Sequence, residues 1–121
     1  MRKILLIEDN EQNLYLVTFI LEKHGYEVAQ ARTGLEGIEM AKKISPDMIL
    51  LDIQLPLMDG YAVVSELRKF ISKEETPIIA ITSFAMPGDR EKALEAGCTD
   101  HITKPINPDT FLISIEKYFL D

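Results

Sequence analysis

Short runs of apolar residues alternate along the chain with segments in which apolar residues recur at helical spacing. The short runs are typical of buried strands, and the spaced segments are typical of helices with one buried face. The pattern therefore predicts five strands alternating with five helices. The expected strands are Lys3–Ile7, Tyr26–Ala31, Met48–Leu51, Pro77–Ile81 and His101–Thr103.

Capping and breaking residues set the limits of the expected helices. A glycine at 25 ends the first helix, which buries Leu14, Val17 and Leu21 on one face. The capping box Thr33–Glu36 begins the second, which runs to about Ile44. The third helix is expected after Asp59-Gly60 and the fourth over Pro87–Ala96. The fifth is expected from Asn107-Pro108-Asp109 onward, where an N-cap, a first-turn proline and an acid follow one another. The expected buried residues are Tyr61, Val64, Leu67 and Ile71 on the third helix and Phe111, Leu112, Ile115 and Phe119 on the fifth.

This alternation predicts an α/β fold, in which a parallel sheet is covered by helices on both faces. We expect one domain over residues 1–121, because the chain shows no linker, repeat or low-complexity segment. Ligands of such open sheets bind beyond the carboxyl ends of the strands. The residues that end each strand are therefore the candidates for chemistry.

Charge and composition narrow the classes of partner. The 121 residues carry a net charge of -7, with 46% hydrophobic and 27% charged side chains. An acidic chain lacks the basic surface that binds nucleic acid or an anionic membrane, so neither is expected. Cys98 is the only cysteine, which excludes an intrachain disulfide, and we expect a small semi-buried side chain there. No signal peptide or long apolar span is evident, so a cytoplasmic protein is expected.

Polar residues end four of the five expected strands. Because the topology brings these ends to one edge, three carboxylates are expected to lie together and to repel one another. A divalent cation would relieve that repulsion, and an oxygen-only ligand set favours Mg²⁺ over Zn²⁺. The residues are Glu8 and Asp9 after the first strand, Asp52 after the third, Thr82-Ser83 after the fourth and Lys104 after the fifth.

Phosphoryl transfer onto a carboxylate is the chemistry that suits this set. Asp52 would act as the nucleophile, and the metal would bridge it to a phosphoryl oxygen. Lys104 and the Thr82 hydroxyl would bind further phosphoryl oxygens. Each of these residues, taken singly, could equally be a structural turn or capping residue. Their joint position at the ends of separate strands favours a functional site.

Four segments carry a resemblance to a known family. They are LLIEDN at 5–10, ILLDIQLPLMDG at 49–60, AITSFAM at 80–86 and TKPI at 103–106. With these segments the whole chain resembles the receiver domain of two-component response regulators, and the single-domain type is most similar. The resemblance implies a flavodoxin-like fold with strand order 2-1-3-4-5.

The resemblance also assigns the phosphoacceptor and its metal. It implies that Asp52 is phosphorylated and that Mg²⁺, with Mn²⁺ as an alternative, is bound by Asp9, Asp52 and the backbone carbonyl of Gln54. Glu8 would act largely through metal-bound water. The Lys104-Pro105 bond is expected to be cis, an isomer that is common only before proline.

A second set of implied roles concerns the response to phosphorylation. Thr82 would sense the phosphoryl group, Lys104 would pair with it, and His101 would be the switch residue. Most family members have Tyr or Phe at that switch position, so His101 adds a pH-sensitive group. The bulky Phe84, two residues after Thr82, would lie near the path of water to the acyl phosphate, so we expect slow dephosphorylation.

The implied function is a signalling switch that assists its own phosphorylation and dephosphorylation, without a separate enzymatic substrate. The phosphodonor would be a histidine kinase, a histidine phosphotransfer protein or both. Because no output domain is evident in the chain, we expect output by binding a target protein through the fourth helix, fifth strand and fifth helix. The fourth helix has a weak apolar stripe and is suited to shifting.

Other interpretations remain. The chain could be a receiver domain of a larger hybrid kinase, although Met1 and compact ends favour a free-standing regulator, or a docking module that needs no phosphorylation. A phosphatase with an aspartyl-phosphate intermediate would want Asp-x-Asp after the first strand, and Glu8-Asp9-Asn10 does not supply it. A flavin carrier would want Ser, Thr and Gly in that loop, where this chain has two acids. Dimerisation is left open.

Overall fold

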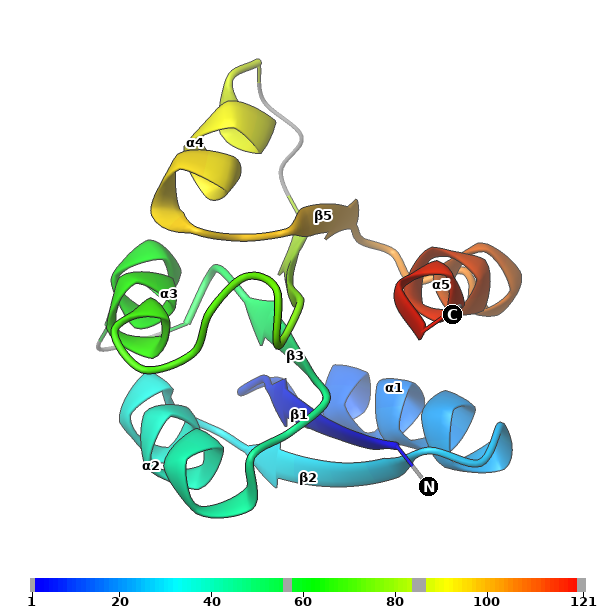
Figure 1. Ribbon diagram of the computed structural model, residues 1–121. Coiled ribbons are helices and arrows are strands. Elements are labelled where there is room, and N and C mark those ends of the chain that lie inside the picture. The colour runs from blue at the N-terminus through cyan, green and yellow to red at the C-terminus, as the bar shows by residue number, and fades with distance from the viewer. Residues whose placement is uncertain (1, 56–57, 84–86, 120–121) are drawn as a thin grey trace.

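The computed structural model describes residues 2–55, 58–83 and 87–119. Within these residues five parallel strands form one sheet in the order β2-β1-β3-β4-β5 (Figure 1), which confirms the predicted flavodoxin-like topology. The strands are β1 (Lys3–Ile7), β2 (Glu27–Ala31), β3 (Met48–Asp52), β4 (Ile78–Thr82) and β5 (Asp100–Thr103). The helices are α1 (Glu11–Lys23), α2 (Gly34–Ile44), α3 (Gly60–Arg68), α4 (Asp89–Ala96) and α5 (Pro108–Glu116), followed by the 3₁₀ turn η1 (Lys117–Phe119).

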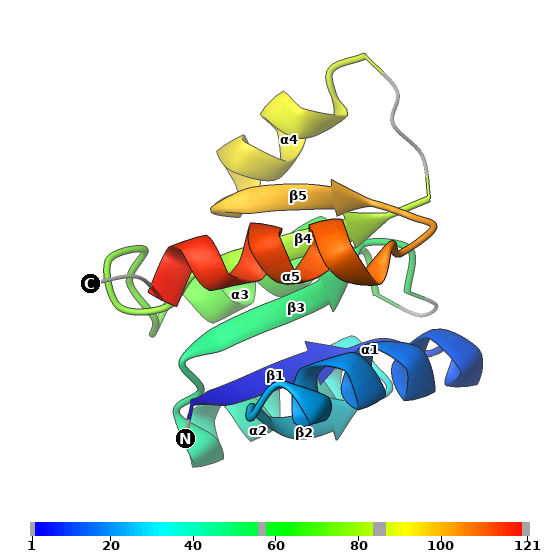
Figure 2. The same cartoon turned by 90° about the vertical axis from the view of Figure 1, so that its right-hand side faces the viewer.

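Helices cover both faces of the sheet. Helices α1 and α5 lie against one face, and α2, α3 and α4 lie against the other (Figures 1 and 2). The strand residues alternate between the two resulting cores: Leu5 and Leu51 pack with α2 and α3, whereas Ile4 and Leu50 pack with α1 and α5. Because β1, β3 and β4 are buried on both faces, their sequences are continuously apolar. None of the described helices is long and apolar enough to cross a membrane.

Several element boundaries differ from the sequence-based prediction. Strand β2 begins at Glu27, because the Tyr26 N–H donates to the Leu21 carbonyl and belongs to the end of α1. Strand β3 extends by one residue to include Asp52. Helix α4 begins at Asp89, later than expected, because Gly88 at its N-cap has a φ of 91°, which is outside the helical region.

The register of the sheet brings the strand ends to one level. Ile7 of β1 pairs with Leu51 of β3, and Asp52 pairs with Ile81 of β4. The residues that follow β1 and those that end β3 and β4 therefore meet at the same edge. This edge is the location that the sequence predicted for the site.

Gly60 shapes the loop that leaves this edge after β3. Its N–H donates to the Ile53 carbonyl at 3.3 Å, and the preceding Asp59 caps α3 by accepting from the Tyr61 N–H. A Cβ atom on residue 60 would lie 2.5 Å from the Ile53 Cα and 2.6 Å from its carbonyl oxygen. Because the near atoms belong to the backbone of Ile53, no side-chain rotation can relieve the clash.

Gly60→Ala is therefore expected to destabilise the protein by about 2 kcal/mol, in the range typical of overpacking. Urea unfolding measures the change. Ser65→Ala on the exposed face of the same helix is the control and should change the free energy of unfolding by less than about 0.5 kcal/mol. Equal stabilities of Gly60→Ala and Ser65→Ala would contradict the close packing of α3 on Ile53.

Candidate functional site

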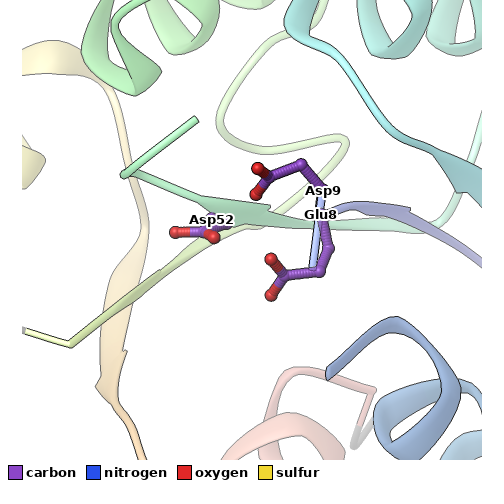
Figure 3. Close-up of side chains that lie close together, drawn as sticks. All are labelled: Glu8, Asp9 and Asp52. Carbon is purple, nitrogen blue, oxygen red and sulfur yellow. The ribbon is translucent and has the colours of Figure 1, made fainter. Parts of the chain in front are cut away.

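Three carboxylates gather at the ends of β1 and β3. Glu8, Asp9 and Asp52 each offer one oxygen, and these oxygens all lie within 4.8 Å of one another (Figure 3). Glu8 and Asp52 are buried, with 1% and 3% of their surface exposed, whereas Asp9 is exposed. The cluster thus has a buried floor and one open side.

Lys104 supplies the positive charge at this floor. Its Nζ lies 3.2 Å from Asp52 Oδ2 and 3.3 Å from Glu8 Oε1. The Lys104 N–H donates to the Thr82 carbonyl at 2.7 Å, and the Lys104-Pro105 peptide bond is cis, as predicted. The structure therefore brings Lys104 to Asp52, as expected. Its second contact, with Glu8, was not foreseen from the sequence, although the two residues end strands of the same sheet.

The Glu8 carboxyl is strongly perturbed by this environment. Burial, a hydrogen bond with Asp52 and the charge of that carboxylate raise the pKa of Glu8 to about 7. The Asn10 N–H, 3.2 Å from Glu8 Oε2, and the Lys104 ammonium oppose the rise. The raised pKa of Glu8 thus reflects first its burial and then the neighbouring Asp52 carboxylate.

The donor set fits a hard divalent cation. Three carboxylates face one lysine, so the fully ionised cluster carries a net charge of -2. Only oxygen ligands are offered, and the exposed Asp9 side leaves access to solvent, which suits an ion such as Mg²⁺ that retains water. Glu8, Asp9 and Asp52 are the side chains that would hold it.

Two further predicted residues lie at the same edge. Thr82 ends β4 and is buried, paired in register with Thr103 of β5. The Gln54 N–H donates to Asp52 Oδ1 at 2.9 Å. The Gln54 carbonyl stays a predicted metal ligand.

Comparison with known proteins agrees with this geometry. The profile of the response regulator receiver domain matches residues 4–116. The chain belongs to this family. It is 39% identical over 120 residues to the polar-differentiation response regulator DivK of Brucella ovis, covering 99% of this chain and 98% of that protein.

Two solved structures extend the comparison. The chemotaxis protein CheY4 of Vibrio cholerae is 31% identical, with a TM-score of 0.91 over 97% of this chain and 98% of that one. The receiver domain of a sensor histidine kinase from Pseudomonas aeruginosa is 34% identical, with a TM-score of 0.87 over 97% and 96%. That second structure holds a magnesium ion in its active-site cleft.

His101 occupies the expected switch position of this receiver domain. It lies half-buried in β5, level with Ala80 of β4, and its N–H donates to Asp100 Oδ1 at 2.8 Å. Its Nδ1 is buried and has no hydrogen-bond partner among the described residues. One ring nitrogen of the predicted switch residue is therefore buried without a polar partner among the described residues. Phe84, for which we expected slow dephosphorylation, lies outside the described residues.

An ionic cluster centred on Asp100 links the elements of the predicted output face. Asp100 Oδ1 lies 3.3 Å from Arg90 of α4, and Oδ2 accepts from the Tyr118 hydroxyl at 2.6 Å and lies 3.4 Å from Lys117 Nζ. Burial and the Asp100 carboxylate raise the pKa of Tyr118 to about 12. The sequence analysis missed this cluster, whose members are separated along the chain and follow no motif.

Cys98 has the structural role that the sequence suggested, and it is more deeply buried than expected. Only 1% of its surface is exposed. Burial raises the pKa of its thiol to about 11, which keeps the reactive thiolate scarce at neutral pH. The thiol packs in the core shared by α3 and α4.

The raised pKa of Glu8 predicts an unusual pH dependence of stability in metal-free protein. Between the unfolded pKa of 4.5 and the folded pKa of about 7, the folded state holds a proton that the unfolded state has lost. Stability should therefore fall as pH rises from about 4.5 to 7, by up to about 3 kcal/mol. Urea unfolding in the presence of a chelator measures this fall.

Glu8→Gln should remove that part of the pH dependence, because its amide does not ionise. Glu22→Gln, an exposed substitution on α1, is the control and should retain the wild-type profile. Parallel stability profiles of wild type and Glu8→Gln from pH 5 to 8 would contradict the assignment.

Proposed function

We propose that this receiver domain is a phosphorylation switch in which Asp52 accepts a phosphoryl group from a phosphohistidine. The donor is a sensor histidine kinase, a histidine phosphotransfer protein or both. The observation that carries the proposal is the environment of Asp52. It is a buried carboxylate at a strand end, paired with Lys104 and flanked by two further acids that fit a divalent cation.

In the transfer step, an Asp52 carboxylate oxygen forms a bond to phosphorus. The phosphorus–nitrogen bond of the donor breaks, and its electron pair stays on the imidazole nitrogen. Charge develops on the phosphoryl oxygens, and the Lys104 ammonium and the Thr82 hydroxyl lie at the edge where it would be stabilised.

Magnesium, with Mn²⁺ as an alternative, would be held by Asp9, Asp52 and the Gln54 carbonyl, with Glu8 assisting. When bound, the ion neutralises the excess negative charge so that an anionic donor can approach. The likeness to a receiver domain that holds magnesium in its cleft supports this assignment. Without a cation, the net negative charge of the three carboxylates and Lys104 would repel a phosphate group.

The switch would follow from the added charge. A phosphoryl group adds about -1.5 to -2 charge at Asp52 and would draw the Thr82 hydroxyl and Lys104 toward it. Because the Thr82 carbonyl accepts from the Lys104 N–H, β4 and β5 are coupled at this point. His101, whose Nδ1 lacks a partner among the described residues, would move into the space that Thr82 leaves.

Output would then pass through the face formed by α4, β5 and α5. Movement of His101 would disturb the neighbouring Asp100, which joins α4 to η1 through Arg90 and Lys117. A target protein that reads this face would distinguish the two states. In this role the domain is a cytoplasmic signalling switch, not an enzyme with a separate substrate, and it contacts neither nucleic acid nor membrane directly.

A receiver domain within a hybrid kinase is the second candidate. It is favoured by the 34% identity to the receiver domain of a sensor histidine kinase. Both candidates use the same phosphoacceptor and differ in what precedes or follows the domain. A docking module that needs no phosphorylation would leave the complete set of Asp52, Lys104 and Thr82 without a use.

Phosphorylation of Asp52 is tested by incubating the protein with Mg²⁺ and acetyl phosphate and measuring its intact mass. Wild type should gain about 80 Da, the mass of one phosphoryl group. Asp52→Asn should gain nothing, because its amide is a poor nucleophile. Asp109→Asn, an exposed substitution on α5, is the control and should gain the same mass as wild type. Absence of an adduct on wild type would refute the proposed function.

The role of Thr82 is tested by NMR at saturating beryllofluoride, which mimics a phosphoryl group on Asp52. In wild type, the amide signals of α4 and β5 should shift. The shifts should shrink to less than about half in Thr82→Ala, which lacks the hydroxyl that contacts the phosphoryl group. Thr82→Ser keeps the hydroxyl and should restore them. Full shifts in Thr82→Ala would show that the signal reaches α4 by another route.

A further inference from the structure

The side chain of Gln54 connects the phosphoacceptor loop to the residue that follows β4. Its Oε1 accepts a hydrogen bond from the Ser83 N–H at 3.0 Å. The backbone N–H of the same Gln54 donates to Asp52 Oδ1 at 2.9 Å. One exposed residue therefore contacts both the phosphoacceptor and the start of the loop between β4 and α4.

This bond replaces one that the sheet would otherwise make. The Ile53 N–H donates to the Ile81 carbonyl at 3.0 Å, as the parallel ladder of β3 and β4 requires. The next bond of that ladder would join the Ser83 N–H to the Ile53 carbonyl. Instead, the Ile53 carbonyl accepts from the Gly60 N–H, and the Ser83 N–H turns to the Gln54 side chain. The Ser83 N–H is thus bound to a side chain that can rotate away.

A backbone N–H at this position is a suitable donor for a phosphoryl oxygen. Hydrogen bonds to an ionised oxygen are roughly twice as strong as those to a neutral amide. A phosphoryl group on Asp52 would bring three such oxygens to the edge where Thr82 and Ser83 end β4. It would therefore compete with Gln54 for the Ser83 N–H.

We propose that the Gln54 side chain is a latch that holds the Ser83 N–H in the unphosphorylated state and must release it when Asp52 is phosphorylated. Gln54 is thus a positioning residue that acts through Ser83. The proposal rests on the proposed function of Asp52. It implies that the latch stabilises the unphosphorylated form and lowers the affinity for a phosphoryl group.

Gln54→Met tests the latch, because methionine has similar length and lacks the amide oxygen. Titration with beryllofluoride in the presence of Mg²⁺ should show an affinity about two- to fivefold higher than that of wild type, the effect of releasing one neutral hydrogen bond. Without beryllofluoride, the Ser83 amide should exchange with solvent faster in this variant. Gln54→Ala should change both quantities in the same direction.

Gln30→Met is the matched control, since it also removes a glutamine side-chain hydrogen bond, here the one that Gln30 Nε2 donates to the Thr18 hydroxyl at the far edge of the sheet. It should leave both the beryllofluoride affinity and the Ser83 exchange rate unchanged. Unchanged or weakened beryllofluoride affinity in Gln54→Met and Gln54→Ala would overturn the latch while leaving phosphorylation of Asp52 intact. Failure of wild type to bind beryllofluoride would instead refute the proposed function.

Discussion

The arrangement of the site depends on the pairing of one partly buried lysine with two buried carboxylates. Lys104 Nζ lies 3.2 Å from Asp52 and 3.3 Å from Glu8, and without it two acids would be buried with no opposite charge. An isolated buried charge costs several kcal/mol, so the pair is what allows Asp52 to remain in the core. The pairing is incomplete, because Asp9 adds a third acid. Burial and the neighbouring Asp52 carboxylate raise the pKa of Glu8, and the remaining negative charge gives the site its fit to a divalent cation.

The strand ends place these groups, because each of them ends a strand or follows one directly. The parallel register of the sheet sets Ile7 beside Leu51 and Asp52 beside Ile81, so acids that are far apart along the chain meet at one edge. Strands β1, β3 and β4 are buried on both faces and fix the height of their own ends. The same edge carries the groups that would respond to phosphorylation. At this edge the Ser83 N–H, which directly follows β4, donates to the Gln54 side chain.

Much of this was accessible from the sequence. The alternating pattern gave the five strands, and the position of polar residues after them indicated which side chains would meet; Asp52 is the clearest case. Individual contacts between side chains could not be predicted from the sequence. The bonds of Lys104 to Glu8, of Gln54 to Ser83 and of Asp100 to Tyr118 join residues that no periodicity or spacing relates. The sequence predicted that α4 starts at Pro87, because proline is common in the first turn of a helix. The helix starts two residues later, because Gly88 adopts a positive φ.

In the proposed function, the carboxylate of Asp52 carries the phosphoryl group. Borohydride reduces an aspartyl phosphate to homoserine and leaves free carboxylates unchanged, so it marks the modified residue. After treatment of the protein with Mg²⁺ and acetyl phosphate, followed by borohydride and peptide mass spectrometry, homoserine should be found at position 52. Homoserine at position 9 or elsewhere, or no homoserine, would contradict the account.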